Sequence, residues 1–320
     1  MVHTVKTTAA RSPSGRPPLA SFWRTVKSEE ARMGYLFIAP AVLLLLLFQF
    51  LPILLAFYLS FTNTEIYNIP GPFIGMKNYI GVVKYPVFWR SMLNAAIMTA
   101  INVPVGIFLS FTSAVLLNER TLRGRTLYRL FYLIPLTGSA VVSSMIWMWL
   151  YHPESGGILN SLLLSLGLIG DKVAWLGEIK TALPAVIFSS WWGFGFNMLI
   201  YLSAVQGIPE SLYKAAVVDG AGRLHILRKI TWPLVKPATF FLLINGILHI
   251  FEAGFTSVYV LTKGGPLHTT EVATHLIYQT GFGYNQLGYA AAMAFVLFLV
   301  SLSVTLILWP KLRQAQEMYV

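Results

Sequence analysis

The segment SLYKAAVVDGAGRLHILRKITWPL, residues 211–234, is a small-residue, basic stretch between two long apolar runs. It carries Lys214, Arg223, Arg228 and Lys229, although only 11% of the whole chain is charged and 56% is hydrophobic. A soluble domain usually carries about 25% charged residues. The composition therefore indicates a polytopic membrane protein, in which this stretch is a polar connection between membrane spans.

Apolar runs long enough to cross a membrane occur six times along the chain. A membrane helix needs about 20 mostly apolar residues, and the qualifying stretches are residues 35–60, 91–117, 128–151, 183–206, 238–261 and 286–309. The fourth is interrupted by Gly193 and Gly195. The sequence thus predicts an all-α membrane protein with six transmembrane helices in a domain of residues 35–309. Residues 1–34 are expected to form a flexible basic tail, not a cleavable signal peptide, and residues 310–320 a short C-terminal tail.

The Lys and Arg residues predict how the chain is oriented. The two tails, the gap between the second and third spans, and residues 207–236 together hold 17 of them, and the opposite side holds 6. The positive-inside rule therefore places both termini and residues 207–236 in the cytoplasm. The net charge of +11 follows from this topology and not from nucleic-acid binding. The chain has no cysteine and no metal-ligand spacing, so no metal site is expected.

Residues 207–236 have the helix signals of a short hairpin. Pro209 suits the first position of a helix, and Glu210 suits its positive end. Asp219–Gly220 then offers a stop, because Gly tolerates positive φ. A second short helix is expected from about residue 223 to 230, with Asp219 as a candidate cap. The exposed face would be small, which lets another surface approach closely; an amphipathic loop resting on the membrane is the alternative.

The order of residues in this hairpin resembles the cytoplasmic loop of permease subunits of bacterial ABC importers. The match is carried by ITWPL (230–234) and by Ala215, Ala216, Asp219, Gly220 and Ala221. The resemblance implies that residues 207–236 form a coupling loop, whose helix docks into a groove on a separate ATPase. Lys214 stands where that family has Glu. The family's carboxylate would pair with a basic group on the ATPase, and a Lys would repel such a group.

The resemblance extends over nearly the whole chain. YLFIAPAVLLLLLFQFLPILLAFYLSFTN (35–63) is similar to the first span of maltose-transporter-type permeases, and FIGMKNY (73–79) to their turn before the second span. The last long loop carries Gly264, Gly265 and Pro266, followed by Thr270, Tyr278, Phe282, Gly288 and Ala291. Together these motifs imply the carbohydrate-importer branch, with a permease bundle of the type I ABC importer kind.

The resemblance also implies partners. The chain has no G-x-x-x-x-G-K-[ST] phosphate loop, so it is not expected to be an enzyme or to bind a cofactor. The implied assembly has a second homologous permease, an ABC ATPase dimer that binds ATP and Mg²⁺, and an external solute-binding protein. It would lie in the plasma membrane of a bacterium or archaeon, with the basic tail facing lipid or solvent. A bulky residue at Gly220 is predicted to abolish ATPase docking.

Polar and aromatic residues inside two spans are candidates for the solute path. In the fifth span, polar side chains spaced by four, three and four residues would share one helical face: Asn245, His249, Glu252 and Thr256. In the fourth, Trp192 and Phe196 are candidates for stacking on sugar rings, and Asn197 for fixing orientation. The alternatives are a polar seam against a neighbouring helix and ordinary aromatic packing.

Two other functions remain open from the sequence. An ion-coupled secondary carrier or channel would act without an ATPase and use Glu252 for ion coupling. Within the importer family, the solute could be a glycerol phosphoester or another non-sugar, although the spans contain little Arg or Lys to face a phosphate. A membrane enzyme is disfavoured, since no nucleophile and base can be placed together.

Overall fold

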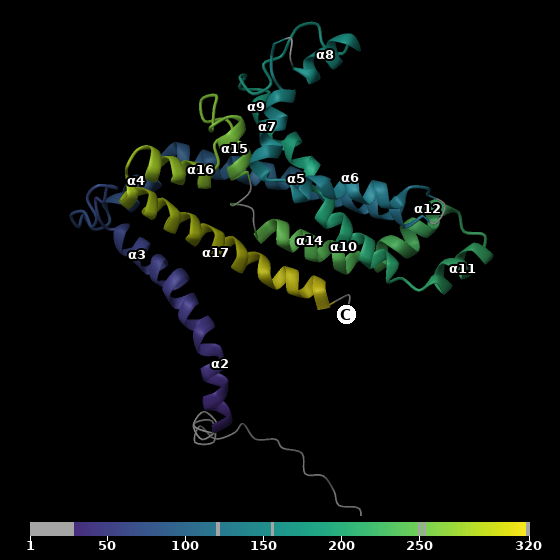
Figure 1. Ribbon diagram of the computed structural model, residues 1–320, viewed down its shortest axis with the longest axis horizontal. Helices are drawn as coiled ribbons and strands as arrows, with labels where there is room; N and C mark the ends of the chain where they lie inside the picture. Colours follow the sequence, from purple (N-terminus) through teal and green to yellow (C-terminus); the bar gives the residue numbers. More distant parts are fainter. Residues whose placement is uncertain (1–28, 120–121, 155–156, 249–250, 252–253, 318–320) are drawn as a thin grey trace, which may run out of the picture. The chain divides into compact units, whose positions relative to one another are not determined.

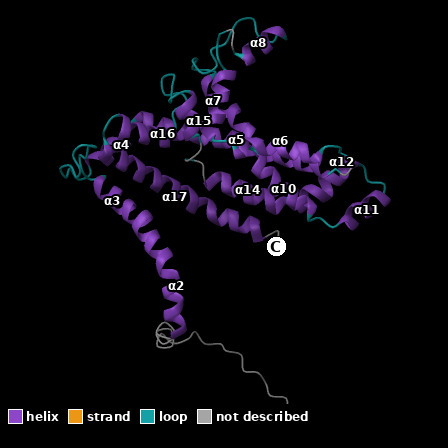
Figure 2. Ribbon diagram, in the orientation of Figure 1, coloured by secondary structure: helices purple, strands orange, loops and turns teal. Residues whose placement is uncertain are grey.

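The computed structural model describes residues 29–119, 122–154, 157–248, 251 and 254–317. This part of the chain is helical (Figures 1 and 2), and its only β-pairings are the isolated bridges Thr62–Phe73 and Glu65–Asn68. By its contacts the chain divides into two compact units, residues 1–56 and 57–320. The predicted all-α class is therefore confirmed.

Most helices follow one another closely, and the longer connections are residues 60–76, 166–181 and 262–272. In chain order they are α2 (Glu29–Leu45), η1 (Leu46–Phe50), α3 (Leu51–Leu59), α4 (Lys77–Val83), α5 (Pro86–Asn118), α6 (Arg125–Thr137), α7 (Ala140–Leu150), α8 (Ile158–Ser165), α9 (Ala182–Ser190), η2 (Trp191–Gly193), α10 (Gly195–Gln206), α11 (Glu210–Val218), α12 (Arg223–Ile226), η3 (Leu227–Thr231), α13 (Trp232–Leu234), α14 (Lys236–Leu248), α15 (Phe255–Leu261), α16 (Ala273–Tyr278), η4 (Gln279–Gly283) and α17 (Leu287–Glu317).

Three helical runs are continuous and apolar enough to cross a membrane. They cover Met33–Leu59, Pro86–Asn118 and Leu287–Ile307, which matches the first, second and sixth predicted spans. The first run has no buried side chain along its length. An apolar helix that is exposed all round suits an environment of lipid or of another membrane subunit.

The core of the second unit forms along α5, which buries one face at both of its ends. Near its start, Phe88, Met92 and Ala95 pack with side chains of α15, α16 and α17. Near its end, Phe111 and Ala114 pack with side chains of α10 and α14. The spacings of three and four residues are those of one helical face. Helix α5 thereby links the end of the unit that holds α16 to the end that holds α12 (Figure 1).

Three further pairs of helices are bent; the first two coincide with the third and fourth predicted spans, and the third joins the end of residues 207–236 to the first part of the fifth predicted span. Residues 125–135 and 140–150 meet at 93°, residues 182–193 and 195–206 at 45°, and residues 223–234 and 236–248 at 61°. The bend in the fourth span falls at Gly193–Gly195, where the sequence shows an interruption. A Cβ on Gly195 would lie 2.1 Å from the carbonyl oxygen of Tyr132, so α10 and α6 cross in close contact there. Six spans are reached when each bent pair counts as one.

The fifth predicted span, residues 238–261, differs from the structure. Helix α14 begins at Lys236 and ends at Leu248, and α15 is a separate helix that begins at Phe255. Gly254 precedes α15 with φ +86°, a left-handed conformation that stops the helix from continuing through it. The prediction of one helix over residues 238–261 is therefore wrong, because a turn divides this apolar run.

Candidate functional site

The connecting loop, residues 207–236, turns sharply after α11. Gly220 has φ +76°. The Ala221 N–H donates to the Ala216 carbonyl at 2.9 Å, and the Gly220 N–H donates to the Val217 carbonyl at 3.1 Å. This pair of bonds is the Schellman motif, which satisfies the last carbonyls of a helix. The predicted stop at Asp219–Gly220 is confirmed, and the turn leads the chain into α12.

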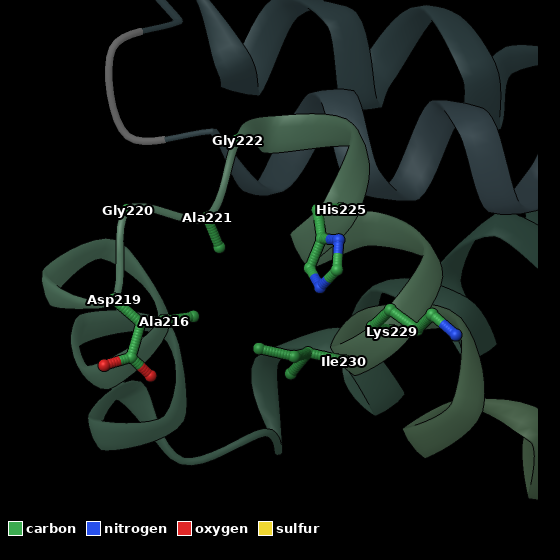
Figure 3. A pocket seen from close by; sticks show the side chains of 8 residues that line it. All are labelled: Ala216, Asp219, Gly220, Ala221, Gly222, His225, Lys229 and Ile230. Atoms are coloured by element: carbon green, nitrogen blue, oxygen red, sulfur yellow. The ribbon is translucent and has the colours of Figure 1, made fainter.

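A hollow of about 500 Å³ lies between the two arms of this loop (Figure 3). Small residues form one side of it, and longer side chains of α12 and η3 form the other, where the His225 ring reaches toward Ala221 (Figure 3). The lining residues are Ala216, Asp219, Gly220, Ala221, Gly222, His225, Lys229 and Ile230. Four residues of the predicted docking site thus border one concave surface.

Two details of the loop differ from the sequence-based expectation. Gly222 is the N-cap of α12, and no side chain caps that helix, so Asp219 does not have the predicted capping role. Pro209 is the N-cap of α11, so this helix begins at Glu210, one position later than predicted. The Asp219 carboxylate is exposed, which leaves it accessible to a partner.

Lys214 forms an ion pair within its own helix. Its Nζ lies 3.6 Å from Oε1 of Glu210, one helical turn earlier, and the two side chains are 73% and 51% exposed. An exposed pair of this spacing contributes only about 0.3–0.5 kcal/mol to stability. The pair therefore adds little to the stability of α11.

A second cavity, of about 340 Å³, lies at the bends of the third and fourth spans. Its lining is almost wholly aromatic: Phe131, Tyr132, Pro135, Trp147, Phe188, Trp191, Trp192 and Phe194. Trp192 packs edge-on against Phe131, with ring centroids 5.8 Å apart. The predicted solute residue Trp192 is thereby part of a concave surface lined by aromatic rings, and the flat face of such a ring can stack on another ring.

One hydrogen bond holds Trp191, a residue that lines this cavity. The indole N–H of Trp191 donates to Oδ1 of Asn102 on α5, over 3.0 Å. The other predicted residues of the fourth span lie elsewhere: Phe196 and Asn197 are on α10 and do not line the cavity. The chain bends between Trp192 and Phe196.

The predicted polar face of the fifth span is only partly described. Asn245 is exposed on α14, and His249 and Glu252 lie outside the described residues. Thr256 belongs to α15, beyond the left-handed turn at Gly254. Since the two helices are separate, the spacing of four, three and four residues does not place Thr256 on the same face as Asn245.

The GGP loop, residues 262–272, is packed around a buried carboxylate. Gly264 has φ +82°, and a Cβ there would lie 2.1 Å from Oε2 of Glu271. The Thr270 hydroxyl donates to the carbonyl of Gly265 at 2.8 Å. Position 264 therefore needs a glycine for two reasons. Its backbone conformation favours glycine, and the Glu271 carboxylate occupies the space that a side chain would need.

Two histidines hold this carboxylate. Nδ1 of His275 is hydrogen-bonded to Oε1 of Glu271, and both side chains are buried. Nδ1 of His268 lies 3.3 Å from Oε2. On α5, the Asn94 amide donates to the backbone carbonyl of Glu271 at 2.9 Å. Burial, followed by the neighbouring Tyr284 and Glu271, raises the pKa of Tyr85, so this phenol stays neutral beside the cluster.

Sequence reasoning missed Glu271, His275 and Asn94. A signal was present, because Glu and His four residues apart meet on one helical turn. The GGP loop is also where non-glycine residues of positive φ gather: Lys263, Leu267 and His268, with Asn285 further along. Such conformations persist where the surrounding packing imposes them, and Glu271 is the buried group around which this packing is built.

Asn78, in the predicted turn before the second span, ties α4 to the end of α3. Its amide donates to the carbonyls of Ser60 and Thr62, each over 2.9 Å, and the side chain is buried. Replacement of Asn78 by Ala leaves both carbonyls without this donor, and we expect a loss of about 1–3 kcal/mol of unfolding free energy. Thermal unfolding in detergent measures it. Lys77→Ala, next to it and exposed, is the control and should change little; equal losses would contradict this role.

Comparison with known proteins gives consistent matches. A family model described as "Binding-protein-dependent transport system inner membrane component" matches residues 102–308. The probable ABC transporter permease protein YesP of Bacillus subtilis is 35% identical over 283 residues, covering 86% of this chain and 89% of the relative. The trehalose/maltose transport system permease protein MalF of Thermococcus litoralis is 32% identical over 285 residues, covering 88% and 94%.

A solved structure is similar as well. It is the crystal structure of a bacterial ABC transporter involved in the import of the acidic polysaccharide alginate, and one of its chains aligns with a TM-score of 0.76 and 25% identity. The alignment covers 92% of this chain and 99% of that chain. The fold of this chain is therefore similar to that of a chain in a known ABC transporter.

Proposed function

The chain belongs to the family of binding-protein-dependent transport system inner membrane components, and from this membership we propose that it imports a sugar or oligosaccharide and is driven through its connecting loop by a separate ATPase. Like its relatives, it is a transmembrane permease subunit of an ATP-driven importer, and it is not an enzyme. What the proposal adds is the class of solute and the residues for coupling and solute contact.

One observation carries the coupling part of the proposal. The connecting loop presents a hollow bordered by the small residues Ala216, Gly220, Ala221 and Gly222. Small side chains let another protein approach the backbone closely, and the hollow gives that protein a place to insert. The chain has no phosphate-binding loop of its own. We assign ATP and Mg²⁺ to the ATPase, whose movement would rock the spans between two access states.

The aromatic cavity supports a sugar as the solute. Apart from Pro135, every residue that lines it is aromatic, and none is charged. Aromatic faces suit the C–H faces of sugar rings, whereas a glycerol phosphoester would require a cation near its phosphate. The cavity lies where two spans are bent, and interrupted helices are where transporters commonly place their substrate sites. Asn245 and Asn197 remain candidates for hydrogen bonds to hydroxyl groups.

The proposal also includes the partners of the chain, its membrane and its orientation. The partners would be a second homologous permease, an ATPase dimer and an external solute-binding protein, in the plasma membrane of a bacterium or archaeon. The Lys and Arg distribution favours cytoplasmic termini, a cytoplasmic connecting loop and an external GGP loop. Basic residues near the membrane would face anionic lipid.

Co-purification tests the proposal. The tagged chain is extracted gently from its native membrane, and the accompanying proteins are identified by mass spectrometry. We expect an ATPase and a second six-span permease, followed by ATP-dependent uptake of candidate sugars when the binding protein is added. Recovery of the chain alone or as a homo-oligomer after cross-linking, with uptake that follows an ion gradient, would support the secondary carrier instead.

Trp192→Ala tests the role of the aromatic cavity. Loss of one stacking ring should raise the sugar concentration for half-maximal uptake about tenfold, equivalent to about 1.4 kcal/mol, and leave assembly with the ATPase unchanged. Uptake by proteoliposomes measures both the half-maximal concentration and the maximal rate. Trp149→Ala is the matched control, because this exposed ring on α7 does not line the cavity. The same shift in both variants would show that the cavity is not part of the solute path.

A further inference from the structure

The connecting loop exposes more positive than negative charge. From the start of α11 to the end of η3, four exposed cations stand against two exposed carboxylates, a net charge of +2 before His225 is counted. Lys214 and Glu210 pair with each other, so they largely cancel. The remaining excess lies on the second arm, where Arg223, Arg228 and Lys229 form no ion pair within the described residues.

Exposed apolar side chains lie beside these charges. Val218, the last residue of α11, is 86% exposed, and Val217 is 63% exposed. Leu224, one residue into α12, is 58% exposed. In a loop outside the predicted spans, apolar side chains at this exposure on either side of a hollow are typical of a protein contact and not of a solvated turn.

The walls of the hollow have the same charge bias. Lys229 and His225 both line it, with Asp219 as the one carboxylate of the lining. In Figure 3 the His225 ring points into the hollow, and the Lys229 ammonium is turned away from Asp219. The flexible stem of a lysine lets the ammonium turn toward an acidic side chain that enters. A basic side chain would find Asp219 alone, and it would be repelled by the cations of α12 and η3.

We propose that the ATPase surface that receives this loop is acidic, with an Asp or Glu side chain placed in the hollow beside Lys229 and His225. This inference rests on the proposed function, because it names the chemistry of the partner at the same site. It also gives a reason for Lys214: a cation on α11 matches an acidic surface, and Glu210 keeps its side chain oriented when no partner is bound.

A zero-length carbodiimide tests the contact in the native complex. The reagent joins an amine to a carboxylate only when the two touch, and mass spectrometry locates the new amide. We expect a link between Lys229 and an Asp or Glu of the ATPase. Lys214 and Glu210, 3.6 Å apart, give an internal control through an amide within α11. An amine-to-amine reagent that joins Lys229 to the ATPase, while carbodiimide does not, would overturn the proposal.

Reversing the charge of Lys214 gives opposite results for the two kinds of partner. On an acidic surface, Lys214→Glu should weaken ATPase retention about tenfold, roughly the loss of one good charge-assisted contact, and Lys214→Gln should weaken it less. On a basic surface, Lys214→Glu should strengthen retention, which would overturn the proposal. Lys180→Glu, in the segment between α8 and α9, is the control and should have no effect. Absence of any ATPase with the wild-type chain would refute the proposed function itself.

Lipid is the competing ligand for these cations. Retention of the ATPase is therefore measured against salt in nanodiscs of zwitterionic lipid, which offer no anionic headgroup. We expect added salt to release the ATPase there too, because the screened charges lie between two proteins. Salt sensitivity that occurs only in nanodiscs containing anionic lipid would assign the cations to the membrane and overturn the proposal.

Discussion

Gly264→Ala is expected to disrupt the GGP loop and to abolish uptake, although it adds only one methyl group. Two costs combine at this position. Alanine in the left-handed conformation costs about 1–2 kcal/mol, and Gly264 has φ +82°. The added Cβ would also lie 2.1 Å from Oε2 of Glu271, so the carboxylate must leave its place.

The second cost is the larger one. Glu271 is buried and hydrogen-bonded to His275, and leaving such a buried polar group without its partner costs about 1–3 kcal/mol, and more when the group is charged. We therefore expect a loss of this order in unfolding free energy, measured as thermal unfolding of the purified complex, together with loss of uptake.

A neighbouring glycine supplies the control for Gly264. Gly265 has no positive φ, and a Cβ there would lie 3.2 Å from the Thr262 carbonyl oxygen, a distance that a small shift relieves. Gly265→Ala should cost about 1 kcal/mol or less. In the double variant Gly264→Ala/Glu271→Ala the steric conflict is gone, so its loss should be smaller than the sum of the two single losses. Equal effects at the two glycines, or simple additivity, would show that Glu271 is not the obstacle.

The three unbroken spans could be predicted because nothing in their apolar runs competes with the helix. Pro104 lies inside α5 and Pro40 inside α2 without ending either helix, as membrane helices tolerate. The bends were harder to predict. Gly193 and Gly195 marked the one in the fourth span, but the turn at Gly254 lies in a run that is apolar overall on both sides of His249 and Glu252. Hydropathy reports where the chain prefers lipid and says little about where a helix within it stops.

The connecting loop was predictable for a different reason. Its geometry depends on local rules, and the Schellman bonds at Ala216 and Ala221 follow from a glycine placed one residue after the C-cap. The cluster at Glu271 depends instead on contacts distant in sequence, since Asn94 on α5 binds its backbone carbonyl. Only the pairing of Glu271 with His275 left a local trace. The aromatic cavity is similar, because Trp191 and Asn102 meet through a hydrogen bond between distant segments.

Gly222→Trp is expected to abolish both ATPase retention and uptake while leaving the spans folded. Gly222 borders the hollow, and no atom outside its chain neighbours lies within 4 Å of the position of a Cβ there. Its φ of −70° is open to any residue. The only local cost is the exchange of Gly for Trp at the N-cap of α12, about 1 kcal/mol. The indole therefore fits the isolated chain and obstructs a partner that must enter the hollow.

Two further variants separate obstruction from strain. Gly220→Trp adds the same ring at φ +76°, so it should lose the ATPase as well and also cost about 1–2 kcal/mol of stability. Gly170→Trp places the ring in an equally open position after α8, away from the loop, and should behave as the wild type. Retention is measured by co-purification, and stability by thermal unfolding of the same samples. Wild-type retention with Gly222→Trp would mean that the partner does not enter the hollow, and the coupling contact would then have to lie on the outer face of α11.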